Sequence, residues 1–166
     1  MSSFFSSAAV CNTGPLIGLA RVQLERLPLQ LFPEVIVPEE VRRELMATDS
    51  PDRIQLERML EGARVPPPQA KPNPLLQTEL DTGEAAVISA AQQLGLSTVI
   101  LDERKARRVA SQVYGLQLKG TAGLLLEAKR LGLIESVGSY LDGMIRGGYF
   151  LGPRLVAACL AAAKED

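Results

Sequence analysis

The chain has 166 residues, of which 46% are hydrophobic and 22% charged, and its formal net charge is -1. This length and apolar content are typical of one globular domain with a substantial core. The sequence contains no histidine, which excludes Ser-His-Asp and Cys-His catalysis, histidine general bases and imidazole zinc sites. Since Cys11 and Cys159 are the only cysteines, a metal site would use oxygen ligands, which suit magnesium and manganese.

Both cysteines lie in apolar runs, and we expect them to be reduced core residues of a cytoplasmic protein rather than disulfide partners. Residues 1–9 lack the basic start and long apolar core of a signal peptide. No window approaches the roughly 18 uninterrupted apolar residues of a membrane span. We therefore expect a single domain over residues 1–166, flexible at residues 1–8 and without membrane contact.

The first predicted strand covers residues 8–11, and an Asn-Thr-Gly-Pro turn ends it. Pro15 suits the first position of the helix that follows. Asn12 is therefore the first polar side chain beyond a strand. A helix cap or an Asx turn would explain this residue type by itself, so a ligand role stands beside a structural one.

Residues 35–37 predict a second strand, and a helix follows from Pro38. Glu39 and Glu40, in its first turn, complement the helix dipole, which accounts for them structurally. Glu44 lies one turn further on and is too far along the helix for that explanation. A solvated helix face and a functional site are equally good interpretations of Glu44.

Residues 51–62 predict a third helix, capped by Asp49 or Ser50. Residues 65–79 form a proline-rich connection within the domain, without regular structure up to Pro74. The next helix runs to residue 94, with Asp81 as its cap and Glu84 placed to close that cap reciprocally.

Residues 99–101 are an unbroken apolar run that predicts a strand buried on both faces. Asp102 and Glu103 follow at its carboxyl end, where open α/β sheets bind their ligands. The structural alternative is that Asp102 caps the next helix and Glu103 is solvated. The helix predicted over residues 104–114 begins with a basic cluster: Arg104, Lys105, Arg107 and Arg108.

Residues 116–118 predict a fourth strand, which leads into a glycine-flanked Thr121 at a helix start. Backbone N–H groups and a hydroxyl at such a position suit a phosphate, although the segment lacks the spacing and lysine of a P-loop. Two further helices are predicted over residues 136–146 and 153–164.

Four strands alternating with helices indicate a three-layer α/β/α sandwich around a mostly parallel sheet of four or five strands. In such a sheet Asn12 and Asp102 lie at the edge formed by the carboxyl ends of the strands. We expect the helices that carry Glu44 and Glu84 to bring these side chains to the same edge. Because clustered carboxylates raise one another's pKa, a divalent cation would relieve their repulsion and activate a water molecule. The basic cluster after Asp102 would then hold a nucleic-acid backbone.

Five segments of the chain form an ordered set of motifs: VCNTGPLI (10–17), VPEEVRREL (37–45), LDTGEA (80–85), ILDERKAR (100–107) and KGTAG (119–123). Taken in this order, they resemble PIN-domain proteins, in the uncharacterised DUF3368-type branch that is related to bacterial toxin nucleases. The resemblance extends from about residue 10 to residue 157.

The resemblance implies a magnesium- or manganese-dependent endoribonuclease, often dimeric, that acts on RNA and, as a toxin, pairs with an antitoxin protein. The family's acidic positions fall on Asn12, Glu44, Glu84 and Asp102, with Glu103 beside the last and Thr121 nearby. By this analogy Asn12, Glu84 and Asp102 are metal ligands, directly or through water, and Glu44 helps to hold the metal.

Asn12 departs from the family pattern, because active PIN nucleases usually have aspartate there. An amide oxygen can ligate a hard cation but adds no negative charge. The second hypothesis is therefore a catalytically weak PIN fold that binds RNA or a protein. A third, a receiver-like phosphoacceptor at Asp102, would need an acid pair after the first strand, where Asn12 stands.

Overall fold

Four short parallel strands form the centre of the structure, a computed structural model that describes residues 4–47, 49–68 and 73–166. Their order across the sheet is β2-β1-β3-β4, and every pairing is parallel. Cys11 lies opposite Ile100 in the register of the two central strands. The strands are β1 (Ala9–Cys11), β2 (Val35–Ile36), β3 (Thr98–Ile100) and β4 (Gln117–Lys119).

Burial along the strands explains their unbroken apolar sequences. Every residue of β1, β2 and β3 is buried, whereas the edge strand β4 is partly exposed. A strand covered on both faces has no solvent side and needs no alternation of polar and apolar residues. The predicted α/β class with a parallel sheet is thereby confirmed.

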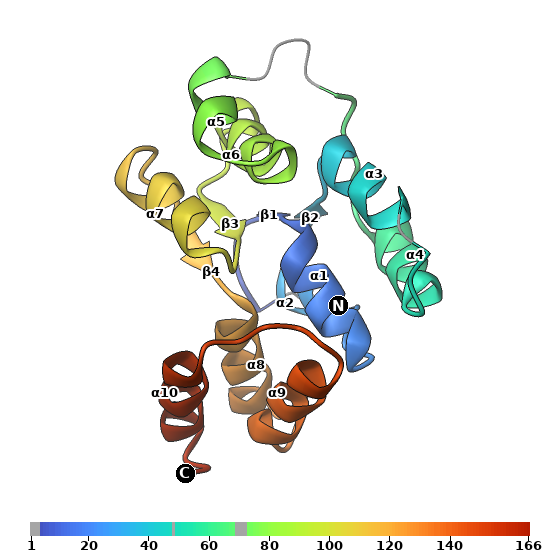
Figure 1. The fold of residues 1–166 in the computed structure, drawn as a ribbon, viewed down its shortest axis with the longest axis vertical. Helices are drawn as coiled ribbons and strands as arrows, with labels where there is room; N and C mark the ends of the chain where they lie inside the picture. Colours follow the sequence, from blue (N-terminus) through green and yellow to red (C-terminus); the bar gives the residue numbers. More distant parts are fainter. Residues whose placement is uncertain (1–3, 48, 69–72) are drawn as a thin grey trace.

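Helices connect the strands and lie on both sides of the sheet (Figure 1). Among the described residues, no helix is long and apolar enough to cross a membrane. The helices are α1 (Thr13–Arg21), α2 (Leu27–Leu31), α3 (Glu39–Ala47), α4 (Arg53–Gly62), α5 (Pro74–Glu79), α6 (Thr82–Leu94), α7 (Arg104–Gln112), α8 (Thr121–Arg130), α9 (Val137–Arg146) and α10 (Pro153–Ala163).

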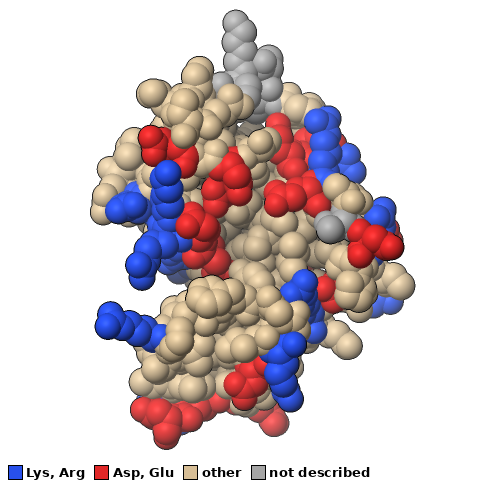
Figure 2. All heavy atoms as spheres, viewed as in Figure 1, with Lys and Arg blue, Asp and Glu red and all other residues tan. Residues whose placement is uncertain are grey.

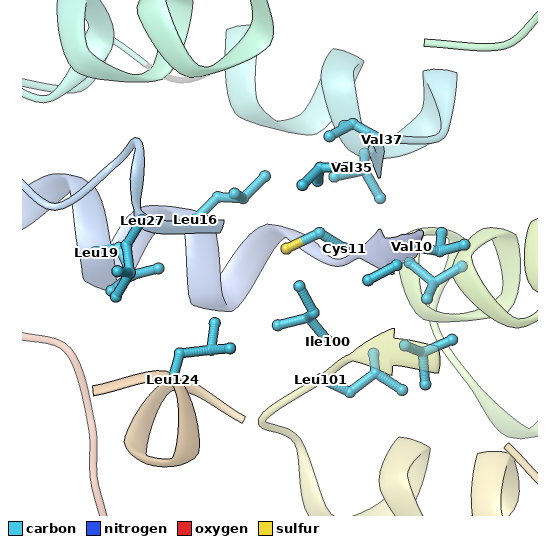
Figure 3. Close-up of a cluster of buried hydrophobic side chains, with 14 of the residues drawn as sticks. Val10, Cys11, Leu16, Leu19, Leu27, Val35, Val37, Ile100, Leu101 and Leu124 are labelled. Atoms are coloured by element: carbon cyan, nitrogen blue, oxygen red, sulfur yellow. The ribbon is translucent and has the colours of Figure 1, made fainter. Parts of the chain in front are cut away.

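The apolar core joins the central strands to α1, α2 and α8 (Figure 3). Leu16 and Leu19 of α1 and Leu124 of α8 are each 0% exposed. Cys11 and Cys159 are both buried free thiols. Full burial of a leucine side chain stabilises a fold by about 1.5–3 kcal/mol, so this cluster fixes α1 and α8 against the strands whose ends carry the candidate site.

Two short helices differ from the sequence prediction. α2 was not predicted, and α5 lies inside the stretch 65–79 that we predicted as a proline-rich connection. Pro74 occupies the start of α5, where proline needs no N–H partner, and the Asn73 side chain caps the helix at the Leu75 N–H. Residues 69–72 of that connection lie outside the described residues. Asp52, rather than Asp49 or Ser50, precedes α4 at the cap position.

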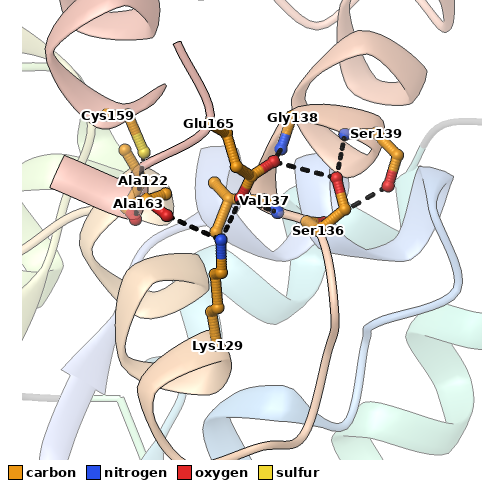
Figure 4. Close-up of polar contacts among 9 residues, drawn as sticks. All are labelled: Ala122, Lys129, Ser136, Val137, Gly138, Ser139, Cys159, Ala163 and Glu165. Carbon is orange, nitrogen blue, oxygen red and sulfur yellow. Dashed lines mark hydrogen bonds and ion pairs between the residues drawn. The ribbon is translucent and has the colours of Figure 1, made fainter. Parts of the chain in front are cut away.

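The side-chain carboxylate of Glu165, which follows α10, links three helices (Figure 4). It accepts hydrogen bonds from Lys129 Nζ of α8 at 2.9 Å and from the Val137 N–H at the start of α9 at 2.8 Å. The Gly138 N–H and the Ser136 hydroxyl also donate to it, each at 2.9 Å. The Lys129 hydrogen bond, followed by those of the backbone, lowers the pKa of Glu165 to about 2.

Candidate functional site at the carboxyl ends of the strands

Asn12 and Asp102 lie side by side because β1 and β3 are neighbours in the sheet. The Asn12 N–H donates to the carbonyl oxygen of Ile100 at 3.1 Å, which extends the strand pairing by one residue. Both residues line a groove of about 960 Å³ that also contains Glu103, Arg104 and Tyr149. The sequence prediction that these strand ends meet at one edge is therefore confirmed.

Asp102 is held by donors at both carboxylate oxygens. The Thr121 N–H donates to Oδ1 at 2.8 Å, and the Thr121 hydroxyl donates to Oδ2 at 2.5 Å. The phenol of Tyr149 also donates to Oδ2. Thr121, which we predicted to meet a phosphate, uses both of these donors on Asp102 here. Its contact with nucleic acid stays a prediction.

The structural alternative is wrong for Asp102, whereas Glu103 is exposed, as that alternative has it. Glu103, and not Asp102, occupies the cap position of α7, where its side chain accepts from the Ala106 N–H at 2.9 Å. Partial burial opposes the ionised form, but the Ala106 and Lys105 N–H groups outweigh it and lower the pKa of Glu103. Asp102 is therefore available to the groove, while Glu103 stabilises the start of α7.

Tyr149 reaches Asp102 from a segment of residues 147–152 that links α9 to α10. Gly148 has a φ of 88°, a left-handed conformation that favours glycine, and it turns the chain back toward the sheet. The ring lies against α1, where a Cβ on Gly18 would come within 2.9 Å of it. Burial, and then the charge of Asp102, raise the pKa of the Tyr149 phenol well above its usual range. The phenol is thus a proton donor to Asp102 over the physiological pH range.

Glu84 forms the predicted capping box at the start of α6. Its N–H donates to Asp81 Oδ1 at 2.7 Å, and the Asp81 N–H donates to Glu84 Oε1 at 3.1 Å. Glu84 is nevertheless only 7% exposed. Burial raises the pKa of its carboxyl, and the charges of Asp81 and Glu103 add to the effect. A buried carboxyl among other acids is stabilised in its ionised form by a nearby cation.

The side-chain oxygens of Glu44 and Asn12 both lie close to Gly83, at the start of α6. A Cβ on Gly83 would lie 2.9 Å from Glu44 Oε2 and 3.3 Å from Asn12 Oδ1. Thr13 holds Glu44 in this position through a hydroxyl hydrogen bond of 3.0 Å to Oε2. Glu44 is an exposed residue of α3, as the solvated-face interpretation has it, and the hydrogen bond from Thr13 turns its carboxylate toward the strand ends.

The side-chain oxygen of Asn12 is buried and has no hydrogen-bond partner in the described structure. Asn12 is only 8% exposed and, although it precedes α1, its side chain does not cap that helix. An unpaired buried amide oxygen costs about 1–3 kcal/mol. Asn12 occupies the cap position of α1, as predicted, but its side-chain oxygen makes no capping hydrogen bond and is a buried acceptor without a donor among the described residues.

The basic residues after Asp102 point in different directions. Arg107 Nη1 donates to the Leu101 carbonyl oxygen at 2.5 Å, and Lys105 pairs with Glu79 at 3.4 Å. Arg104 lines the groove, whereas Arg108 is an exposed residue of α7. Figure 2 shows acidic side chains gathered on this face between α7 and α3, with basic side chains beside them. Of the four basic residues predicted to contact nucleic acid, Arg104 is the one that lines the same groove as Asn12 and Asp102.

A cation would have few direct protein ligands at this edge. Within the described ranges, no three acidic or cysteine side chains are spaced to hold a metal ion by themselves. The carboxylates expected in one cluster have different hydrogen-bond partners: Thr121 donates to Asp102, Thr13 to Glu44 and the Asp81 N–H to Glu84. Magnesium is commonly bound through one or two carboxylates and several waters. The unpaired Asn12 oxygen and the all-oxygen donor set fit a hard divalent cation bound in that way.

Tyr149 is the residue of the site that the sequence analysis missed. It is separated from Asp102 by 47 positions, and its segment carries no strand-end pattern. The Gly147-Gly148 pair before it marks a turn, which is the one signal that this segment changes direction. Nothing in the residue types alone indicates which carboxylate the phenol would reach.

The geometry is that of a parallel α/β domain with a polar site at its strand ends. A family model described as DUF3368, PIN domain, matches residues 8–165, and the chain belongs to this family. PIN domains are generally nucleases, a class of hydrolases, and generally use divalent metal ions. A search of curated proteins found no match.

Proposed function

We propose that this PIN domain is an endoribonuclease that hydrolyses RNA phosphodiester bonds with a magnesium- or manganese-activated water. The observation that carries the proposal is the buried, unpartnered Oδ1 of Asn12. It lies at the same strand edge as Asp102 and faces Glu44 across Gly83. An acceptor without a donor, placed among carboxylates, is a ligand position for a hard cation.

Asn12, Glu84 and Asp102 would hold the ion, directly or through water, and Glu44 would support it. Bound there, the ion would supply a water of lowered pKa and stabilise the charge that develops on the phosphate. This role needs no histidine, which agrees with the composition of the chain.

The protein's own contribution is to fix the oxygen ligands before substrate binds. Thr121 and Tyr149 fix the orientation of Asp102, and Asp81 fixes Glu84 through the capping box. Prior orientation lowers the entropic and reorganisation cost of reaching the transition state. The basic side chains of α7 would bind the RNA backbone in a salt-dependent way: Arg104, Lys105, Arg107 and Arg108.

A second candidate function is binding of RNA or protein without efficient cleavage. Asn12 brings no negative charge, and both oxygens of Asp102 already accept hydrogen bonds. These two observations would weaken metal binding. The proposal also includes a toxin role beside an antitoxin-type protein, a homodimer, and a cytoplasmic location, which the two buried free thiols favour.

Cleavage of a labelled RNA oligonucleotide by the purified protein tests the proposal. We expect cleavage with Mn²⁺, none with EDTA, and a loss of at least about 100-fold in Glu84→Gln and Asp102→Asn. Glu61→Gln is the matched control, because Glu61 is an exposed carboxylate of α4. Metal-independent cleavage, or full activity in either site variant, would contradict the site assignment. Metal-independent binding without cleavage would favour the second candidate.

A further inference from the structure

Phe150 is held out in solvent by its neighbours in the chain. Phe150 is 85% exposed, although its side chain is large and apolar. Tyr149 before it is fixed inward by Asp102, and Leu151 after it is only 8% exposed. With both flanking residues anchored on the inner side, the side chain between them points outward.

The same groove contains Phe150 and the strand-end oxygens. Its lining joins Asn12 and Asp102 to Phe150, with Arg104 at the start of α7 and Arg154 near the start of α10. Figure 2 shows Lys and Arg side chains on both sides of the hollow between α7 and α10. An exposed aromatic ring between basic side chains matches a chain that alternates flat bases with phosphates.

We propose that Phe150 is a stacking platform for one unpaired nucleobase in the groove that also contains Asp102. This inference rests on the proposed function, since it places RNA in the groove. Arg104 and Arg154 contact the phosphates on the two sides of that nucleotide. A base in a duplex has its faces covered by neighbouring base pairs, so Phe150 selects an unpaired nucleotide at this position.

The stacking subsite differs from the cation site in what it requires. A π-face binds any base and needs no divalent ion, so the contribution of Phe150 persists when metal is removed. Binding in EDTA therefore isolates the subsite from the chemistry. Ile54 of α4 is a suitable control, because it is 63% exposed and does not line the groove.

Fluorescence anisotropy with a labelled, non-self-complementary oligoribonucleotide in EDTA tests the inference. We expect Phe150→Ala to weaken binding by about 5- to 100-fold, the range for loss of one base–aromatic stack. Phe150→Trp restores binding, and Ile54→Ala leaves it unchanged. Hybridising the same oligonucleotide to its complement removes most of the dependence on Phe150.

Equal binding by wild type and Phe150→Ala would overturn the stacking role. The stacking role would also be overturned if Phe150→Ala changed the oligomeric state in sedimentation but left RNA binding unchanged. Phe150 would then be a contact between protein chains. The proposed nuclease is judged separately after Mn²⁺ is added. RNA binding that depends on Phe150, without cleavage in Mn²⁺, would support the stacking role and contradict the nuclease function. If wild type and Phe150→Ala bind RNA equally and cleave it equally, the nuclease is supported and the stacking role of Phe150 is excluded.

Discussion

Asp102 owes its orientation to two residues that are distant in the chain. Thr121 supplies an N–H and a hydroxyl from the start of α8, and Tyr149 supplies a phenol from the 147–152 segment. A carboxylate has about four lone-pair sites. These three hydrogen bonds therefore leave one site, on Oδ1, for an external ligand. The arrangement orients Asp102 without consuming its capacity to bind.

Removing the Tyr149 hydroxyl tests this orienting role. Tyr149→Phe keeps the ring against Gly18 but deletes a hydrogen bond to a charged group, worth about 1.5–3 kcal/mol. We predict that kcat for RNA cleavage falls by about 10- to 100-fold while KM changes little. Tyr140→Phe on α9 is the control. An unchanged kcat would show that Thr121 alone positions Asp102.

Replacing Asn12 tests whether its oxygen belongs to the ion site. Asn12→Asp adds a buried charge beside Glu44, so we predict a lower melting temperature without metal. The added charge should also tighten Mn²⁺ binding by about tenfold, equivalent to about 1.4 kcal/mol. Thermal melts with and without Mn²⁺ measure both effects. A metal-induced rise in melting temperature no larger than that of wild type would exclude Asn12 from the site.

At the residue scale, sequence reasoning found the residues that directly follow strands or cap helices. Asn12 and Asp102 are predictable because parallel strands end at one edge, and Glu84 because the capping box is a local pattern. The Asp102 partners Thr121 and Tyr149 depend on tertiary contacts over 19 and 47 positions. No local rule gives those contacts.

At the element scale, α1 provides the surface on which Tyr149 rests. Gly14 and Gly18 are one helical turn apart, and a Cβ at either position would approach the tyrosine, at 3.2 and 2.9 Å respectively. Glycine normally weakens a helix interior by about 0.5–1 kcal/mol relative to alanine. The cost is offset here by the close approach of the aromatic ring that donates to Asp102.

A pair of glycine substitutions separates this packing role from helix propensity. We predict that Gly18→Ala destabilises the fold by about 1–3 kcal/mol, as overpacking does, and lowers cleavage by displacing Tyr149. Gly123→Ala in α8 meets no atom within 4 Å, so it should stabilise by about 0.5–1 kcal/mol. Urea unfolding of both variants gives the comparison. Equal changes in the free energy of unfolding of the two variants would contradict the packing of Tyr149 against α1.

Element prediction succeeded where patterns were long and failed where helices were short. α6 has 13 residues and a complete capping box, and its start and end agree with the sequence prediction. α2 and α5 have only 5 and 6 residues, which is too short for a clear helical period. Helices of this length depend on tertiary packing for their stability, and a lone sequence does not show that packing.

At the scale of the whole molecule, the Glu165 carboxylate holds α8, α9 and α10 together through its hydrogen bonds. Its pKa in the folded state, about 2, lies below the ordinary value of 4.5. A lowered folded pKa stabilises the protein above the ordinary value, and this contribution disappears as the pH falls toward 2. The folded arrangement of these helices is therefore acid-sensitive at one identified group.

Thermal melts across this pH range test the linkage. We predict that Glu165→Gln melts several degrees below wild type at pH 7 and that the difference shrinks steadily below about pH 4.5. Asp166→Asn, at an exposed neighbouring carboxylate, should melt like wild type at every pH. A difference that persists unchanged to about pH 2 would mean that lost packing, and not lost charge, destabilises the variant.

The global architecture followed from the alternation of apolar runs and helical segments. That pattern gives the parallel class and the edge at which ligands bind, and β2-β1-β3-β4 agrees with it. It does not give the orientation of each acid at that edge. Hydrogen bonds from Thr13, Asp81 and Thr121 set those orientations.

The central claim is that the oxygens at the strand ends bind a divalent cation. Titration calorimetry with Mn²⁺ on the purified protein, beside Asp102→Asn, tests it most directly. The account predicts saturable binding by wild type and a loss of at least about tenfold in affinity, about 1.4 kcal/mol, in the variant. Identical binding by the two folded proteins, or no binding by wild type, would contradict it.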